Sequence, residues 1–124
     1  MDENITNALH VDMVVDITTT GRKTGEERRI EIWAHFIEGR ILMAGAPGTR
    51  SWYANMLADP NVTLHLKGDV RIDLPATARA VTDPTERREL LTAIKGASEF
   101  EQRRTMDVDA WVKGSCLVEL TLRQ

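Results

Sequence analysis

Basic side chains crowd into one short polar stretch, residues 18–29 (TTTGRKTGEERR), which holds Arg22, Lys23, Arg28 and Arg29. The two glycines of this stretch would allow backbone N–H groups to point inward as an anion-binding nest. Side chains alternate along a strand, so one of the two consecutive arginines must face inward, and a buried guanidinium needs a polar or anionic partner. A solvated hairpin also favours glycine and polar residues, so the stretch indicates either a plain turn or a site for a small anion.

A second stretch, residues 44–62 (AGAPGTRSWYANMLADPNV), places small residues at the end of an expected strand. Gly45, Ala46 and Gly48 would let a flat group approach the backbone closely. The helix expected to follow would add a partial positive charge at its first turn. This stretch therefore points the same way as the first, toward a bound ligand.

The other residue types that commonly do chemistry form no rival site. His10, His35 and His65 do not cluster at metal-ligand spacing, and we expect His35 and His65 on outward strand faces, so no metal is assigned. Cys116 is expected to be a small core residue. No nucleophile–base pair and no Gly-x-Gly-x-x-Gly fingerprint is found, so reduced nicotinamides should be poor direct hydride donors.

The elements that must position these residues are mostly strands, because apolar residues recur with a period of two. The expected strands cover residues 11–19, 28–38, 40–46, 61–67, 70–81 and 115–122. The expected helices cover residues 50–59, 83–95 and 99–104. Pro60 ends the first, Asp83 and Gly96 bound the second, and Ser98 and Glu101 give the third a capping spacing.

Short connections between these strands imply antiparallel neighbours. Gly68 and Asp69 are expected to form a two-residue hairpin turn, and Pro75 to mark a bulge or an edge. Six strands are many for a flat sheet in so small a chain, so closure is expected. The fold class predicted is α+β, mainly β: a six-stranded antiparallel barrel with two to three peripheral helices.

Composition fits one globular domain over residues 1–124, with 42% hydrophobic and 28% charged residues. The net charge of −3 provides no global basic field for nucleic acid, so the local basic cluster suits a small anionic ligand better. The single cysteine fits a reducing compartment. The acidic N-terminus is unlike a signal peptide and no segment is apolar enough to span a membrane, so a cytoplasmic location is expected.

Three blocks together resemble the deazaflavin-dependent nitroreductase family of the split β-barrel flavin-reductase superfamily. They are TTTGRKTGEERRIEIW (18–33), WYANMLADPNVTL (52–64) and ATARAVTDPTER (76–87), and the resemblance covers roughly residues 14–90. It implies the cofactor coenzyme F420, an 8-hydroxy-5-deazaflavin with a phosphodiester and an oligoglutamate tail, held in a split β-barrel.

The resemblance also implies roles for individual residues. Lys23 and Arg28 would hold the phosphate, with Arg22 and Thr24 near the tail. The loop before the first long helix is shorter than in many members and lacks their lysine, so Arg50 would take its place.

The deazaflavin ring would lie beside a second group of residues implied by the same resemblance: Ile32, Trp33, Ala44, Gly45, Ala46, Trp52 and Asn55. Met56 and Phe100 would bound the substrate. The chain has Glu31 where many members have proline, and its 95–111 segment has no tyrosine of the kind that contacts substrate in some members.

The function expected is hydride transfer from reduced coenzyme F420 to a small planar electrophile such as a quinone, nitroaromatic or enone. The alternatives are an FMN-dependent split-barrel oxidoreductase, a non-catalytic deazaflavin carrier and a plain structural barrel. Relatives in the superfamily often form dimers, and Trp33 and Ile37 could serve a homodimer interface as readily as a cofactor.

Overall fold

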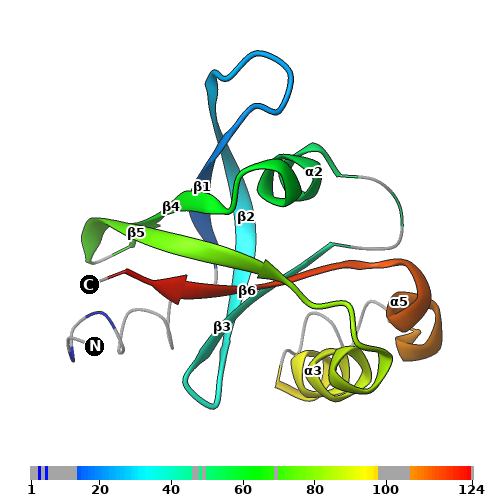
Figure 1. Cartoon of the computed structure of the whole chain (residues 1–124). Coiled ribbons are helices and arrows are strands. Elements are labelled where there is room, and N and C mark those ends of the chain that lie inside the picture. The colour runs from blue at the N-terminus through cyan, green and yellow to red at the C-terminus, as the bar shows by residue number, and fades with distance from the viewer. Residues whose placement is uncertain are drawn as a thin grey trace.

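The computed structural model describes residues 3, 5, 14–45, 48, 50–68, 70–97 and 107–123. The strands are β1 (Val14–Thr20), β2 (Glu27–Ile37), β3 (Arg40–Gly45), β4 (Asn61–Lys67), β5 (Arg71–Ala80) and β6 (Cys116–Leu122). The helices are α2 (Ser51–Ala58), α3 (Pro84–Ala97) and α5 (Val108–Gly114). Every strand pairs with antiparallel neighbours in the order β1-β2-β3-β6-β5-β4, which closes a barrel (Figure 1). The predicted antiparallel barrel is confirmed.

The barrel interior is filled by the apolar residues that the period of two predicts. Val15 and Ile17 of β1, Met43 of β3 and Leu64 of β4 are fully buried in one interior cluster. Cys116 belongs to the same cluster, which confirms it as a small core residue. Burying an aliphatic side chain of this size stabilises a fold by about 1.5–3 kcal/mol, so this cluster fixes the register of the strands.

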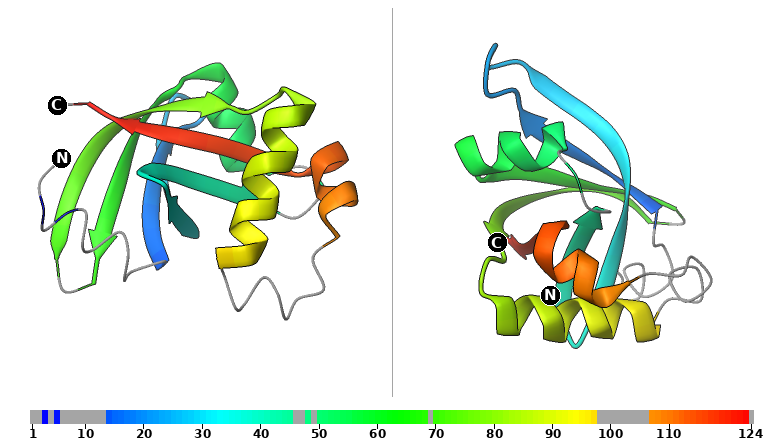
Figure 2. Two further views of the ribbon diagram at one scale, coloured as in Figure 1. Left: turned by 90° about the horizontal axis from the view of Figure 1, so that it is seen from below. Right: turned by 90° about the vertical axis from the view of Figure 1, so that its right-hand side faces the viewer.

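A second apolar cluster lies outside the barrel, where α3 and α5 cover β3 and β6 (Figure 2). Leu42 and Leu117 face outward from these strands and pack against Leu91 and Ile94 of α3 and Trp111 of α5. Both faces of β3 and β6 are therefore buried, which explains their continuous apolar runs. Among the described residues, no helix is long and apolar enough to cross a membrane.

The prediction that His35 and His65 lie on the surface is wrong. His35 is only 5% exposed because it lies opposite Leu42 under the helical layer, and this burial lowers the pKa of its imidazole. His65 is 7% exposed and is held between neighbouring strands, with Nε2 2.6 Å from Thr18 Oγ1 and Nδ1 2.7 Å from Asp73 Oδ1. The alternating pattern gave the correct strand face, but it does not show what covers that face.

Helix α5 was not predicted from the sequence. Its N-cap is Asp107, whose side chain accepts hydrogen bonds from the backbone N–H groups of Asp109 and Ala110, and Trp111 is its buried anchor. An acidic N-cap of this kind is a recognisable start signal, but one apolar anchor in a seven-residue helix gives no clear period. The helix predicted over 99–104 lies outside the described residues.

The β4–β5 connection is longer than predicted. Lys67 pairs with Arg71, so the turn spans the three residues 68–70 and not two. The register between β4 and β5 is continuous through Pro75, without a bulge, and β5 pairs with β6 only from Ala76 onward. Pro75 lies where the pairing with β6 ends: its carbonyl accepts from the N–H of Arg123 at 2.9 Å, and its own nitrogen has no hydrogen to donate in return.

Four charged side chains join α3 to the barrel. Arg40 donates to Glu119 at 2.7 Å and to Glu86 at 3.1 Å, and Arg79 donates to the same two carboxylates at 2.7 and 2.9 Å. The hydrogen bond from Arg40, followed by that from Arg79, outweighs burial and lowers the pKa of Glu119 from 4.5 to about 2.

This network predicts an acid-dependent loss of stability. Because the pKa of Glu119 is lower in the folded chain than its ordinary value of 4.5, its contribution is complete above pH 4.5 and is lost as the pH falls toward 2. We expect the free energy of unfolding of the wild type to fall more steeply over this interval than that of Glu119→Gln, in denaturant titrations at successive pH values. Parallel curves for the two proteins would show that the network does not stabilise the fold.

Candidate functional site

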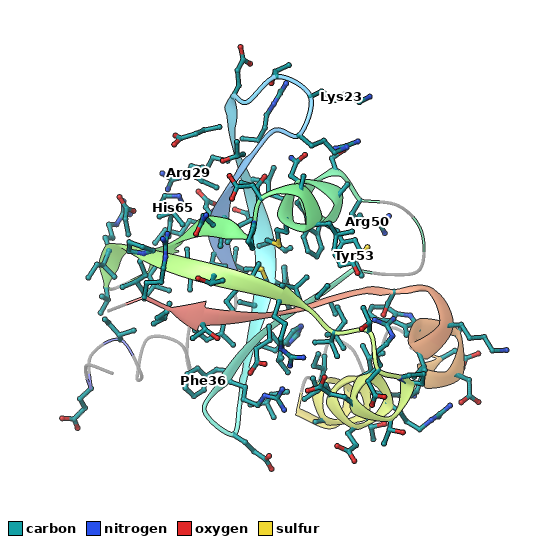
Figure 3. The ribbon with its side chains drawn as sticks, viewed as in Figure 1. Lys23, Arg29, Phe36, Arg50, Tyr53 and His65 are labelled. Atoms are coloured by element: carbon teal, nitrogen blue, oxygen red, sulfur yellow. The ribbon has the colours of Figure 1, made fainter. Side chains whose placement is uncertain are left out.

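A pocket of about 410 Å³ lies between the β1–β2 hairpin and α2, and we call it the hairpin pocket. Its lining residues are Thr19, Gly21, Arg22, Lys23, Thr24, Arg28, Ile30, Ser51, Trp52 and Asn55. The hairpin extends beyond the barrel above α2, and Lys23 lies in its loop (Figure 3). Two stretches that are some 30 positions apart in the sequence thus meet around one cavity.

The strand register decides which of the two consecutive arginines faces this pocket. Arg28 lies directly opposite Thr19, which is 2% exposed on the inner face of β1. Arg29 lies on the outer face, where its Nε donates to Asp16 Oδ2 at 2.9 Å. The predicted alternation therefore places Arg28 at the pocket and Arg29 on the opposite side of the strand.

The hairpin pocket is electropositive. Arg22, Lys23 and Arg28 line it, and no carboxylate of the described residues does. None of these three side chains forms an ion pair within the described ranges, whereas Arg29 and Lys67 on the outer face of the barrel both pair with Asp16. Three cations that share a cavity without carboxylates repel one another, and a bound anion would relieve that repulsion.

The predicted backbone nest is wrong. The N–H of Gly21 donates to the carbonyl of Glu26 at 2.7 Å, and the N–H of Gly25 donates to the carbonyl of Gly21 at 2.8 Å. Both groups are used to close the turn, in which Gly25 takes a positive φ of 74°. Any anion in the pocket would therefore be held mainly by side chains.

Asn55 connects three parts of the pocket wall. Its side chain is 5% exposed, its Oδ1 accepts from the backbone N and the Nη1 of Arg22 at 3.1 and 3.0 Å, and its Nδ2 donates to Thr19 Oγ1 at 3.2 Å. The amide thus joins α2 to β1 and to the hairpin turn. Its polar atoms are already engaged within the protein.

Two residues expected beside the deazaflavin ring, Ile32 and Trp33, lie apart from the hairpin pocket. Ile32 and Trp33 are neighbours on β2 and so face opposite sides: Ile32 packs toward the barrel interior, and Trp33 is 37% exposed on the outside. Neither lines the hairpin pocket. Met56, expected to bound the substrate, is 4% exposed within the interior cluster, which leaves little surface for such a contact.

The end of β3 approaches the start of α2. A Cβ at Gly45 would lie 3.4 Å from Nε of Arg50 and 3.5 Å from Cζ2 of Trp52, so these three residues are in contact. Trp52 also lines the hairpin pocket, which connects this strand end to it. Ala44 instead packs toward the outer helical layer. Ala46 and Phe100 lie outside the described residues.

Three lining residues were not singled out from the sequence: Thr19, Ile30 and Ser51. Two of them could have been found from the period of two. Ile30 shares its strand face with Arg28, and Thr19 is the residue opposite Arg28 in an antiparallel hairpin.

The closed six-stranded antiparallel barrel, with an electropositive pocket beside a helix, has the fold of the solved split-barrel structures that it resembles. The chain matches the family model of F420H(2)-dependent quinone reductases over residues 2–112 and belongs to that family. The resemblance found in the sequence is thereby confirmed.

Solved structures agree with this fold. A conserved hypothetical protein of Mycobacterium tuberculosis, Rv2991, is 18% identical with a TM-score of 0.77, over 100% of this chain and 82% of that one. A structure named F420 reductase is 13% identical with a TM-score of 0.73, over 100% and 97%. A third, named F420-H2 dependent reductase (FDR-A), is 26% identical with a TM-score of 0.59, over 90% and 94%.

Membership of this family makes the protein an F420H2-dependent reductase with coenzyme F420 as its cofactor. The residues of the hairpin pocket fit this cofactor, because its phosphodiester and glutamates are anions and the pocket offers cations without carboxylates. The family match therefore supplies the ligand class that the charge of the pocket requires.

Proposed function

We propose that the protein reduces a small planar electrophile, most simply a quinone, with the anionic part of coenzyme F420 bound in the hairpin pocket. When bound, the reduced deazaflavin supplies a hydride from its C5 carbon. The observation that carries the proposal is the set of three pocket cations, Arg22, Lys23 and Arg28, without carboxylate partners among the described residues. Each would form a charge-assisted hydrogen bond with a phosphate or carboxylate oxygen.

The chain's own residues would act by binding and orientation. Arg28 and Lys23 would fix the phosphate, which sets the position of everything attached to it. Trp52, 9% exposed and shared between the pocket and the Gly45 strand end, would give the ring a flat apolar wall. A quinone that accepts a hydride and one proton from water becomes the hydroquinone, so this reaction requires no acid–base pair of the protein.

The acceptor class can be tested by anaerobic mixing of the protein with reduced coenzyme F420 and a panel of acceptors. We expect menadione, a planar quinone, to be reduced, and a nitroaromatic and an enone to be accepted more slowly because the family match names quinones. A parallel reaction with reduced FMN should be much slower. Tight binding of F420 without oxidation by any acceptor would contradict the reductase and favour a carrier.

A further inference from the structure

We propose that Asn55 is a positioning residue of the hairpin pocket, which holds Arg22 in place for an anionic ligand without neutralising its charge. This inference rests on the proposed function, because it concerns how the same pocket binds the anionic part of its ligand. Asn55 is not assigned a contact with the ligand.

The contacts of Asn55 fit a clamp better than a ligand contact. One oxygen accepts two hydrogen bonds from Arg22, at 3.1 Å from its backbone and at 3.0 Å from Nη1. The amide nitrogen is directed away to Thr19 Oγ1 at 3.2 Å. Because Asn55 is 5% exposed and sits on α2, it fixes both the turn and the guanidinium relative to a rigid helix.

The neutral amide distinguishes Arg22 from the arginines that pair with carboxylates in the described part of the chain. Arg29, Arg40, Arg79 and Arg88 all donate to carboxylates of Asp or Glu. Arg22 donates to a side-chain amide, and no carboxylate of the described residues pairs with it. An amide oxygen can orient a guanidinium while the full positive charge stays available to a ligand.

Arg22 is exposed, so an unrestrained side chain would sample many rotamers and would have to be ordered when the ligand binds. A restraint made before binding removes part of that entropic cost. The amide at position 55 therefore combines two properties that affect affinity in the same direction: it pre-orders the cation, and it leaves the charge of the cation intact.

The substitution Asn55→Asp tests whether the neutral charge of the side chain at position 55 matters for ligand binding. The carboxylate is nearly isosteric, can accept both bonds from Arg22, and can accept from the Thr19 hydroxyl, so the melting temperature should stay close to that of the wild type. Binding of F420, followed by its fluorescence, should weaken about tenfold or more, the effect of losing one charge-assisted hydrogen bond. The control for the added charge is Asn61→Asp, at an exposed position that does not line the pocket; it is compared for F420 binding alone, because it also removes the hydrogen bond from Asn61 Nδ2 to Asp59 Oδ1. An unchanged dissociation constant for Asn55→Asp would overturn the proposal.

A double-mutant cycle tests whether Asn55 acts on ligand binding by holding Arg22 in place. Arg22→Ala and Asn55→Ala should each weaken F420 binding about tenfold, and the double variant should be weakened about tenfold as well, because both changes remove the same oriented cation. Independent, multiplying effects would overturn the inference, since Asn55 would then act without Arg22. If Arg22→Ala and Arg28→Ala both bind F420 as the wild type does, the pocket assignment itself fails, which is a different result. Should Asn55→Ala not fold, Asn55→Ser replaces it in the cycle with the same expected coupling.

Discussion

Replacing Arg28 with alanine is expected to weaken the binding of coenzyme F420 by about 1.5–3 kcal/mol, roughly a 10- to 150-fold rise in the dissociation constant. Arg28 lines the hairpin pocket from the inner face of β2, opposite Thr19, and no carboxylate of the described residues competes for it. Its guanidinium would therefore contribute a hydrogen bond to a charged group. The measurement is an equilibrium titration followed by the fluorescence of F420.

The neighbouring residue provides a matched control. Arg29→Ala removes the same side chain one position further along β2, but on the outer face where Arg29 pairs with Asp16. This variant should bind F420 within about twofold of the wild type, since exposed pairs contribute little. Equal losses in both variants would show that only net charge matters, and no loss in a folded Arg28→Ala would return the stretch to a solvated hairpin.

Replacing Arg87 with methionine is expected to lower the free energy of unfolding by about 3–5 kcal/mol. Arg87 is 8% exposed, and its guanidinium donates to the backbone carbonyls of Val81, Trp111, Val112 and Ser115 at 2.7–3.0 Å. The carbonyl of Val112 lies in the last turn of α5, where carbonyls lack a partner N–H within the helix, whereas the carbonyl of Trp111 also accepts from the N–H of Ser115 at 2.9 Å. Without the guanidinium, several buried acceptors would be left unsatisfied at about 1–3 kcal/mol each.

The control for this change is again the next residue. Arg88→Met removes an exposed arginine that pairs with Asp109, and it should change the free energy of unfolding by less than about 1 kcal/mol. Denaturant titration of both variants makes the comparison. If Arg87→Met is as stable as Arg88→Met, the carbonyl cluster does not hold α5 to α3 as the contacts indicate.

The barrel could be predicted from the sequence because a strand with one buried face shows its period directly. Residues 61–67 illustrate this: Val62, Leu64 and Leu66 alternate with polar residues along the sequence, and all three are buried. His35 shows the limit of the same reasoning. Its strand face was predicted correctly, but its burial depends on α3, which packs there from a distant part of the chain.

The candidate site likewise has features that the sequence shows and features that only the structure shows. The basic turn and the glycine-rich strand end stood out because charge and residue size are visible in the sequence. The direction of Arg28 became clear only from its register with Thr19, and the opposite directions of Ile32 and Trp33 follow from the same strand geometry. The contacts that Asn55 makes could not be predicted, because its partners Arg22 and Thr19 lie more than 30 positions away.

A crystal structure of the protein bound to coenzyme F420 would show directly where the phosphate of the cofactor lies. We expect phosphate oxygens within hydrogen-bonding distance of Arg28 and Lys23 in the hairpin pocket, with Asn55 still bound to Arg22 and Trp52 beside the ring. A phosphate bound outside the hairpin pocket, with Arg28 and Lys23 facing solvent, would contradict this expectation.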